Sequence, residues 1–459
     1  MNPRPGRPDG VVVLGGSLAG LFAAAAAARA GRHVTILERD GEPQDLEARS
    51  GVPQGRQAHA FLYRGLLALE ELLPGVRREL IDAGAVPLDT GDLAWLGELG
   101  WSPIGRPAFE VVSATRPLLE HVVRGRVTAL PGVDIRYGLR VDGLARTPTG
   151  WRVHARSAAG GDAGREEVSA EVVVDATGRS SRLHTWLPPL GIAAPRRDVV
   201  DARVGYAARL YTRNSSAPGV PGIVLLATPE WPRGGLALPV EGDRWLVGAV
   251  GFGDARPPRD VPGYEAFLTT LRDPAIADIV GRCEPVSDVA VHRQTGNERR
   301  RYERVRGWPD GLLVLGDALC SFDPIYGQGI TVAALQALLL GATLANPLRP
   351  GAAARLQRAL ASITRLPWAI ATGEDARYPS SGREPSFGQR LLRAWTTEVS
   401  RLALHGDARA LTTLTGVYHL MVPPAHLVHP LLVTSAVSSR LHARRPPAPR
   451  PAALSAATG

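Results

Sequence analysis

A run of six small residues near the N-terminus has the spacing of a turn that binds the pyrophosphate of a dinucleotide: Gly15, Gly16, Ser17, Leu18, Ala19 and Gly20. Gly15 would allow the tight turn, Gly20 would let a helix pack closely on a strand, and the first amides of that helix would bind phosphate oxygens. Ser17 replaces the usual middle glycine, and its hydroxyl could donate a hydrogen bond. Glu38 could accept hydrogen bonds from an adenosine ribose. A glycine turn without a ligand is the alternative.

A second segment with chemical potential is Asp175-Ala176-Thr177-Gly178-Arg179-Ser180-Ser181-Arg182. Here an apolar strand ends in an aspartate, and a turn of small residues follows. The pattern is similar to the second sequence signature of flavoprotein hydroxylases. A purely structural turn would show the same pattern, so this segment carries weight only beside the other two.

The third segment runs from Gly316 to Gly329 and is the most informative. Asp317 stands at the end of an apolar strand, where its carboxylate could hold the ribityl hydroxyls of FAD. The residues from Pro324 to Gly329 predict a turn that opens a helix. Its amides would face the N1/O2 edge of the isoalloxazine, which becomes negative on reduction. The three segments in this order predict one FAD, bound by three separated stretches of chain.

These segments require buried strands and helices to position them. Four apolar runs are typical of parallel strands buried on both faces: Gly10–Leu14, His33–Leu37, Glu171–Asp175 and Gly311–Leu315. Helices are predicted at about Leu18–Arg29, 60–86, Tyr264–Val280 and Gly329–Leu344, with further C-terminal helices at 388–443. Residues 134–156 alternate as hairpin strands with a turn at Thr147–Gly150, and residues 200–291 are rich in strands.

The predicted fold class is α/β: a Rossmann-like FAD-binding fold interwoven with a β-sheet substrate domain, plus C-terminal helices. The FAD-binding domain is assigned to residues 10–65, 112–199 and 292–365. The substrate-binding domain is assigned to residues 66–111 and 200–291, and the C-terminal helical region to 366–443. Residues 1–9 and 444–459 are rich in proline, arginine and alanine and are predicted to be disordered.

Composition excludes several other functions. The 459 residues carry a formal charge of +9 but contain no lysine, which excludes a P-loop lysine, a pyridoxal-phosphate Schiff base and a catalytic lysine. The arginines are scattered, without a basic block interleaved with aromatics, so no nucleic-acid partner is expected. Cys283 and Cys320 lie far apart in no metal-ligand spacing, so neither a disulfide nor a metal site is predicted.

The sequence also bears on location. The N-terminus lacks the apolar core of a signal peptide, and the alanine-rich run from Leu21 to Ala30 is shorter than a membrane span. No stable membrane insertion is expected, and a cytoplasmic enzyme is predicted.

With these motifs, the chain resembles the Rossmann-fold flavoprotein monooxygenases of the para-hydroxybenzoate hydroxylase type, and more narrowly the actinobacterial branch that includes polyether epoxidases. The similarity covers roughly residues 10 to 440 and is carried by residues 15–21, 51–75, 116–124, 175–182 and 299–329. It implies that Arg116 lies beside the FAD and that the loop from Arg49 to His59 runs near the flavin ring. The chain departs from the branch at Gln57, where histidine is usual, and at Asp323, where asparagine is usual.

Motifs and resemblance together give one set of predicted cofactor contacts: Gly15, Ser17, Leu18, Ala19, Gly20, Glu38, Arg39, Arg49, Gln54, Arg116, Asp175, Gly178, Asp317, Pro324, Gly327 and Gly329. No catalytic residue is assigned, although His59 is a candidate for proton handling near the flavin, with a structural role as its alternative. Three aromatic residues of the strand-rich region are expected to roof the site, or else to belong to the core: Trp231, Trp245 and Phe252.

The resemblance implies a monooxygenase whose reduced FAD reacts with O2 to a C4a-hydroperoxide, which then epoxidises or hydroxylates a lipophilic secondary metabolite, such as a polyene. Electrons would come from NAD(P)H or from a separate flavin reductase. A flavin-dependent halogenase is opposed by the absence of lysine. A non-redox cyclase that keeps FAD as a scaffold and an FAD-dependent reductase stay open, and Asp323 favours the cyclase because an extra carboxylate opposes an anionic reduced flavin.

Overall fold

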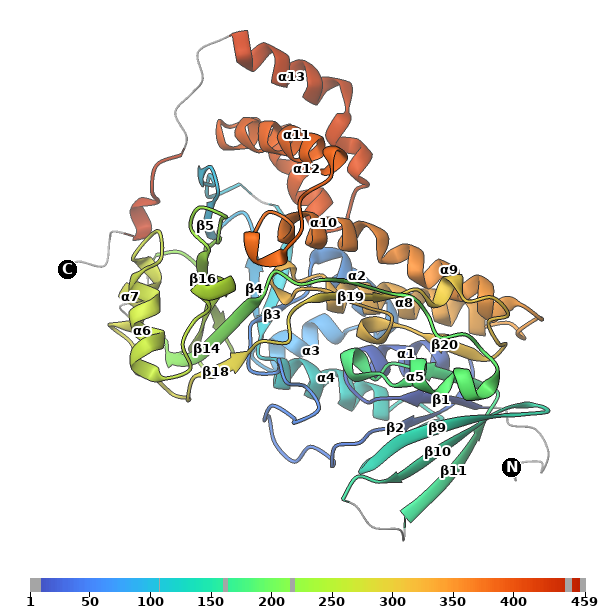
Figure 1. Cartoon of the computed structure of the whole chain (residues 1–459). Helices are drawn as coiled ribbons and strands as arrows, with labels where there is room; N and C mark the ends of the chain where they lie inside the picture. The colour runs from blue at the N-terminus through green and yellow to red at the C-terminus, as the bar shows by residue number, and fades with distance from the viewer. Residues whose placement is uncertain (1–9, 107, 160–163, 215–218, 442–447, 455–459) are drawn as a thin grey trace.

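A parallel sheet of five strands lies in the lower right part of the molecule in Figure 1. The computed structural model describes residues 10–106, 108–159, 164–214, 219–441 and 448–454. The strands lie in the order β20 (Leu312–Val314), β12 (Val172–Asp175), β1 (Gly10–Leu14), β2 (His33–Leu37) and β8 (Val133–Arg136). Neighbouring strands all pair in parallel. The valines of β1 are at most 2% exposed, as expected for a strand covered on both faces.

Two helices rich in small residues pack together against this sheet. They are α1 (Leu18–Arg29) and α8 (Gly329–Leu344), and both have the predicted bounds. A Cβ on Gly341 of α8 would lie 3.1 Å from the carbonyl oxygen of Ala26 in α1, so the two helices approach closely. The alanine-rich run is therefore part of the core. Helices α4 (Arg116–Thr128) and α9 (Ala352–Ile363) contribute to the same core.

An antiparallel sheet of three strands lies beside the parallel sheet: β9 (Leu139–Thr147), β10 (Gly150–Ser157) and β11 (Arg165–Ala170). The predicted hairpin turn between β9 and β10 is confirmed. The prediction was wrong for residues 134–136, because these belong to β8 and pair with β2 in the parallel sheet.

The strand-rich middle region forms a mixed sheet of seven strands. Their order is β18 (Ala290–His292), β14 (Val204–Thr212), β17 (Arg244–Phe252), β16 (Arg233–Val240), β15 (Ile223–Leu225), β5 (Ala94–Gly97) and β6 (Gly100–Trp101). The helix predicted over 264–280 is two helices, α6 (Val261–Thr269) and α7 (Ala275–Val280). Pro274 interrupts them, and the Asp273 carboxylate accepts the amide hydrogen of Ala275.

Residues 60–86 were likewise predicted as one helix but form two, α2 (Tyr63–Leu72) and α3 (Val76–Asp82). Gly75 separates them with a φ of +88°, which an L side chain rarely adopts. Both helices bury leucines in the core of the parallel sheet, whereas β5 and β6, which belong to the same predicted segment 66–111, pair within the seven-stranded sheet. The domain boundaries stay an interpretation.

Two small sheets connect the larger units. One contains β3 (His59–Ala60), β7 (Glu110–Ala114) and β4 (Val86–Asp89), and the other β13 (Arg197–Val200), β19 (Asn297–Arg300) and β21 (Cys320–Ser321). These strands lie in the segments of chain that connect the parallel sheet with the seven-stranded sheet.

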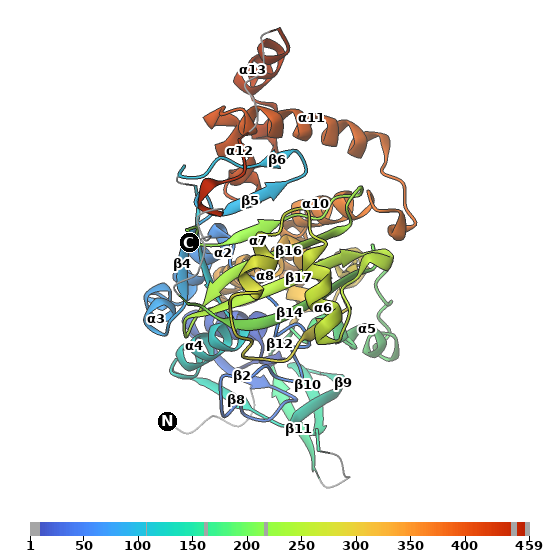
Figure 2. The ribbon, with the colours of Figure 1, turned by 90° about the vertical axis from the view of Figure 1, so that its left-hand side faces the viewer.

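Three C-terminal helices stand beyond β5 and β6 at the edge of the seven-stranded sheet (Figure 2): α11 (Phe387–Leu404), α12 (Ala408–Tyr418) and α13 (Pro430–Leu441). Helix α10 (Arg365–Asp375) precedes them and contacts α9 and β19. Glu98, in the turn between β5 and β6, binds Arg377 at 2.6 Å and Arg393 at 2.9 Å. The rings of Trp95 and Tyr418 also meet, with centroids 6.4 Å apart.

The prediction of disorder for residues 444–459 was wrong for residues 448–454. Ala448 forms a bridge with Trp101, Leu454 is buried, and Arg450 Nε lies 2.7 Å from an Asp273 carboxylate oxygen. The remaining residues of both predicted disordered segments lie outside the described part of the chain. Within the described ranges, no helix is long and apolar enough to cross a membrane, and no group of His, Cys, Asp and Glu could hold a metal ion.

We expect Gly20→Ala to lower the free energy of unfolding by about 1–3 kcal/mol, because the new Cβ would lie 1.9 Å from the Gly15 carbonyl oxygen. Urea denaturation would measure the change. Gly388→Ala in α11 is the matched control: it is also a helical glycine, its Cβ would meet nothing within 4 Å, and alanine should be neutral or stabilising there. Equal effects of the two substitutions would contradict the close packing at Gly20.

Candidate functional site

The three chemically suggestive segments meet at one edge of the parallel sheet. The first follows β1, the second follows β12 and the third follows β20. These strands are neighbours in the order β20-β12-β1 and run in parallel, so their carboxyl ends lie side by side. Open parallel sheets bind ligands at this edge. The fold thus brings together segments that are far apart in the sequence.

The glycine turn after β1 has the predicted geometry. Gly15 has a φ of +95°, and a Cβ there would lie 2.9 Å from the carbonyl oxygen of Ala176 in the second segment. Leu18 points into the core. Ala19 contacts the third segment, because a Cβ on Gly316 would lie 2.8 Å from the Ala19 Cβ. This turn is therefore where the three segments touch, and no larger residue at Gly15 would leave room for it.

Glu38 lies at the end of β2 and organises the adjacent backbone. Its carboxylate accepts the amide hydrogen of Gly16 at 2.6 Å and that of Asp40 at 2.9 Å. Arg49 Nη1 lies 3.4 Å from Glu38 and 3.2 Å from Asp40. Arg39 is more exposed, and its Nε lies 3.8 Å from Asp40. Arg49 is thus brought to the glycine turn, whereas Arg39 stays at its periphery.

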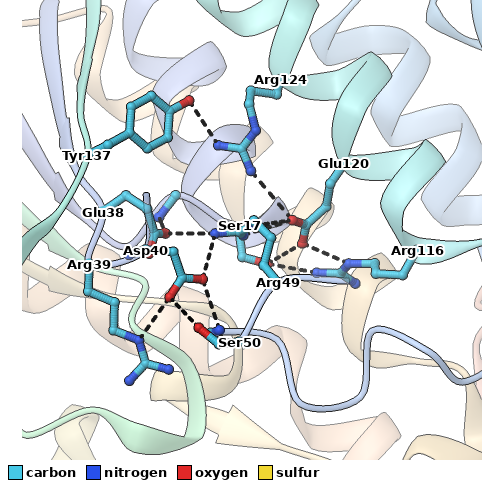
Figure 3. Close-up of polar contacts among 12 residues, drawn as sticks. Ser17, Glu38, Arg39, Asp40, Arg49, Ser50, Arg116, Glu120, Arg124 and Tyr137 are labelled. Atoms are coloured by element: carbon cyan, nitrogen blue, oxygen red, sulfur yellow. Dashed lines mark hydrogen bonds and ion pairs between the residues drawn. The ribbon is translucent and has the colours of Figure 1, made fainter. Parts of the chain in front are cut away.

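A buried carboxylate, Glu120 of α4, joins the first segment to two of the three predicted arginines, Arg49 and Arg116 (Figure 3). It accepts hydrogen bonds from the Ser17 hydroxyl at 2.6 Å and from Arg116 Nε at 2.9 Å, and Arg49 Nη2 lies 2.8 Å from it. Arg116 also donates to the Ser17 hydroxyl oxygen at 2.8 Å. Glu120 was not among the predicted cofactor contacts. The i,i+4 spacing of Arg116 and Glu120 on a helix was the available signal.

These neighbours hold the cluster in its charged form. Burial alone would raise the pKa of Glu120, but Arg116, Arg49 and the hydrogen bond from Ser17 together lower it to about 2. Burial lowers the pKa of Arg49, but the carboxylates of Glu120 and Glu38 outweigh this, and the net effect is a raised pKa. Two guanidinium groups therefore lie at the N-terminus of α1. This donor set fits the pyrophosphate of FAD.

In the second segment, Asp175 serves the turn that follows it. Its carboxylate accepts the Thr177 amide hydrogen at 3.0 Å and the hydroxyl hydrogens of Thr177 and Ser181, and the side chain is 1% exposed. Gly178 has a φ of +73° at the start of the short 3₁₀ helix η2 (Gly178–Ser180). A direct contact of Asp175 or Gly178 with a cofactor stays a prediction.

In the third segment, Asp317 presents a carboxylate to the same edge from the 3₁₀ helix η6 (Gly316–Ala318). Among the described residues no hydrogen bond or ion pair to this carboxylate is found. The side chain is partly accessible, so a ligand can reach it. Burial raises its pKa, while Arg179 and Arg116 oppose that rise. A carboxylate that lacks a protein partner here fits the predicted role of binding ribityl hydroxyls.

The residues from Pro324 to Gly329 form the turn that opens α8. Pro324 begins the 3₁₀ helix η7 (Pro324–Tyr326), Gly327 follows with a φ of +64°, and Gly329 is the first residue of α8. The N-cap position of α8 is Gln328, whose side chain makes no capping hydrogen bond. The first amides of this 16-residue helix therefore lack a side-chain acceptor, which suits a site that binds a negative group.

His59 lies in β3, close to Arg116. Its Nδ1 is 2.8 Å from the carbonyl oxygen of Gln57, and burial together with the charge of Arg116 lowers its pKa to about 3. The ring is therefore neutral at neutral pH. Gln57 donates from Nε2 to the carbonyl oxygen of Ala290 at 2.9 Å, and the carbonyl oxygen of Gln54 accepts the Gln57 amide hydrogen. The loop thus bridges the first segment and the seven-stranded sheet.

The predicted aromatic roof is only partly available. Trp245 is fully buried. The Phe252 ring is also buried and stacks on Tyr378 with centroids 3.6 Å apart. Trp245 and Phe252 therefore belong to the core. Trp231 is 45% exposed and donates from Nε1 to the carbonyl oxygen of Thr270. The core alternative given in the sequence analysis therefore holds for Trp245 and Phe252.

We expect Glu120→Gln to lower the free energy of unfolding by about 3 kcal/mol at pH 7, because the folded pKa of about 2 lies well below the ordinary value of 4.5. A carboxyl group whose pKa is lower in the folded state stabilises the fold at pH values above its unfolded pKa. This stabilisation is lost as the pH falls through the folded pKa. The difference between wild type and variant should therefore shrink from pH 5 towards pH 2.

Urea denaturation across that range would measure it. Asp82→Asn, which removes an exposed partner of Arg78, is the control and should change stability little at any pH. A difference between wild type and Glu120→Gln that stays constant with pH would contradict an ionised Glu120 in the folded protein.

Comparisons with known proteins agree with this geometry. The FAD binding domain family matches residues 10–373, most of the chain. The chain is 31% identical over 406 residues to Protein Rv3254 of Mycobacterium tuberculosis, covering 84% of each. It is 28% identical over 376 residues to kynurenine 3-monooxygenase of Salinispora arenicola, covering 77% of this chain and 76% of that one.

Solved structures support the fold. The crystal structure of p-nitrophenol 4-monooxygenase PnpA from Pseudomonas putida aligns with a TM-score of 0.63 at 16% identity, covering 90% of this chain and 96% of that one. At this identity the likeness concerns the fold alone. The predicted α/β fold, the FAD cofactor and the resemblance to FAD-dependent monooxygenases are confirmed. The chain belongs to the FAD binding domain family.

Proposed function

We propose that this flavoprotein inserts one oxygen atom from O2 into a lipophilic secondary-metabolite substrate, by epoxidation or hydroxylation. The convergence of the glycine turn, the unpartnered Asp317 and the uncapped N-terminus of α8 at one sheet edge carries the proposal. FAD held by these residues would supply the activation of O2: one oxygen atom would go to the substrate and the other would leave as water. NAD(P)H supplies the electrons, either directly or through a separate flavin reductase.

The residues of the first segment hold the adenosine half of the cofactor in this proposal. Arg49, Arg116 and the amides of α1 bind the pyrophosphate. Ser17 donates its hydroxyl hydrogen to Glu120 and accepts a hydrogen bond from Arg116, so it positions these two side chains. Glu38 binds the ribose. Its two oxygens each accept one backbone amide hydrogen, and a carboxylate oxygen has a further lone pair for a hydroxyl group.

The third segment holds the flavin half. Asp317 accepts hydrogen bonds from the ribityl chain, and the turn at Pro324, Gly327 and Gly329 directs the first amides of α8 at the N1/O2 edge. His59 stays neutral beside Arg116, so the proposal gives it a positioning role and no proton transfer. The protein then binds the substrate between the sheet edge and the seven-stranded sheet, and water is excluded there.

The test uses the FAD-loaded protein with labelled O2 and candidate polyene or aromatic substrates. Anaerobic reduction, followed by substrate and ¹⁸O2, should give a product that carries one labelled oxygen, observed by mass spectrometry. Product formation with oxidised FAD under nitrogen would instead identify the cyclase alternative. Reduction of a double bond without consumption of O2 would identify the reductase alternative.

We expect Asp317→Ala to raise the dissociation constant of FAD about 10- to 100-fold, because a hydrogen bond to a charged group contributes about 1.5–3 kcal/mol. Flavin fluorescence on titration would measure it. The free energy of unfolding without FAD should not fall, because burial disfavours the charge of Asp317 in the folded protein. Asp82→Ala on the exposed face of α3 is the control, and wild-type FAD affinity in Asp317→Ala would refute this contact.

A further inference from the structure

A buried polar cluster that no step of the proposed function uses lies directly behind the flavin-facing turn. Its members come from four parts of the chain: Tyr206 of β14, Asn297 of β19, Asp323 and Tyr326 beside η7, and Asp375 of α10. Asp323 is 1% exposed, and Asp375 and Asn297 are fully buried. We call these five residues the carboxyl junction.

Asn297 joins the two carboxyl residues of the junction. Its Oδ1 accepts the backbone amide hydrogen of Asp323 at 2.9 Å, and its Nδ2 donates to the Asp375 carboxylate at 2.6 Å. Tyr326 donates to the other Asp375 oxygen at 2.9 Å. The turn that opens α8 is thus held to α10 through two side chains.

Tyr206 joins the junction to the seven-stranded sheet. Its hydroxyl donates to Asp323 Oδ1, which also accepts the amide hydrogen of Ile325 at 3.2 Å. Ile325 packs in an apolar cluster with residues of β14 and β17 and with Tyr378. Polar and apolar contacts therefore fix the same turn against the substrate-side sheet.

The hydrogen bonding does not support two negative charges. Asp323 Oδ2 is buried and has no hydrogen-bond partner in the described part of the chain. An ionised Asp323 would leave that oxygen without compensation in a low-dielectric site, and a second carboxylate beside it raises the cost. Protonation of one carboxyl lowers this cost, because it removes one of the two buried charges.

Three charged residues on neighbouring elements act on the junction: Arg179, Asp201 and Glu374. Arg179 of η2 donates to the carbonyl oxygens of Gly296 and Phe322, so its charge is directed at backbone on both sides of the junction. Asp201, before β14, and Glu374 of α10 add negative charge. Burial raises the pKa of Asp323, and burial and the charge of Asp323 raise the pKa of Asp375.

We propose that the carboxyl junction holds one proton between Asp323 and Asp375 at neutral pH, and that this proton positions the flavin-facing turn against the seven-stranded sheet and α10. Asp323 and Asp375 are then positioning residues. The second half of the proposal rests on the proposed function, because it requires FAD at this turn. The junction then carries one negative charge instead of two, which weakens the argument that Asp323 makes for the cyclase.

The shared proton is tested by infrared spectroscopy of the protein with and without added FAD, which detects the carbonyl stretch of a protonated carboxylic acid. The wild type should keep such a band at pH 7, where ordinary Asp and Glu side chains are ionised. Asp323→Asn should weaken the band, because Asp375 then loses the charge of Asp323 but stays buried. The double variant Asp323→Asn/Asp375→Asn should remove it. Asp82→Asn is the control and should keep the band. A wild type without the band, an unchanged band in Asp323→Asn, or a band that persists in the double variant overturns the proposal.

The positioning role is tested by the pH dependence of two quantities in the same proteins. A raised carboxyl pKa means that the folded state binds more protons, so unfolding free energy falls as pH rises from about 4 into the neutral range. This fall should become shallower in Asp323→Asn. The dissociation constant of FAD should rise with pH in the wild type and stay nearly constant in Asp323→Asn.

The outcomes separate the two hypotheses. An FAD affinity with the same pH dependence in wild type and variant overturns the positioning role. A protein that shows the infrared band and the stability profile but binds no FAD at any pH refutes the proposed function, while the shared proton stands. A stability profile that is identical in wild type and Asp323→Asn overturns the junction itself.

Discussion

The contact of Gly15 with Ala176 and Gly20 is the constraint on which the rest of the site depends. The Gly15 turn lies so close to the end of β12 and to α1 that a Cβ on Gly15 or Gly20 would overlap backbone atoms. This contact sets the position of α1 on β1 and, through β12, the position of the second segment. The parallel pairing of β12 with β20 then brings the third segment to the same edge. Loss of this contact would separate the three segments.

Two buried carboxyl sites on either side of this edge show opposite electrostatics. Glu120 faces Arg49 and Arg116 at hydrogen-bond distance, and its pKa is lowered. Asp323 accepts a hydrogen bond from Tyr206 and Asp375 accepts one from Asn297, and the pKa of both carboxyls is raised. Burial acts on all three in the same direction, so the neighbours decide the outcome. Arginine neighbours therefore keep Glu120 ionised, whereas at the carboxyl junction burial favours protonation.

Two segments that were predicted as single helices show where an apolar pattern fails to predict the end of a helix. The apolar spacing over 60–86 and 264–280 continues across both breaks, because both helices of each pair face a core. Gly75 and Pro274 interrupt them, and the break lets each half turn to its own neighbour. The order of residues 448–454 has a similar origin, since Arg450 and Leu454 find Asp273 and the second core far away in the sequence.

The sequence by itself determined the strand–turn–helix units and the chemistry at their ends. β1, α1, β2 and α8 have the predicted bounds, because buried apolar runs and glycine turns are local signals. Only the tertiary structure decided which side chains meet. Glu120 lies 103 residues from Ser17, and Asp323 lies 117 residues from Tyr206, so no spacing in the sequence reports these contacts. The charge of a buried carboxyl depends on those distant neighbours, and for that reason the protonation of this site could not be derived from the residues alone.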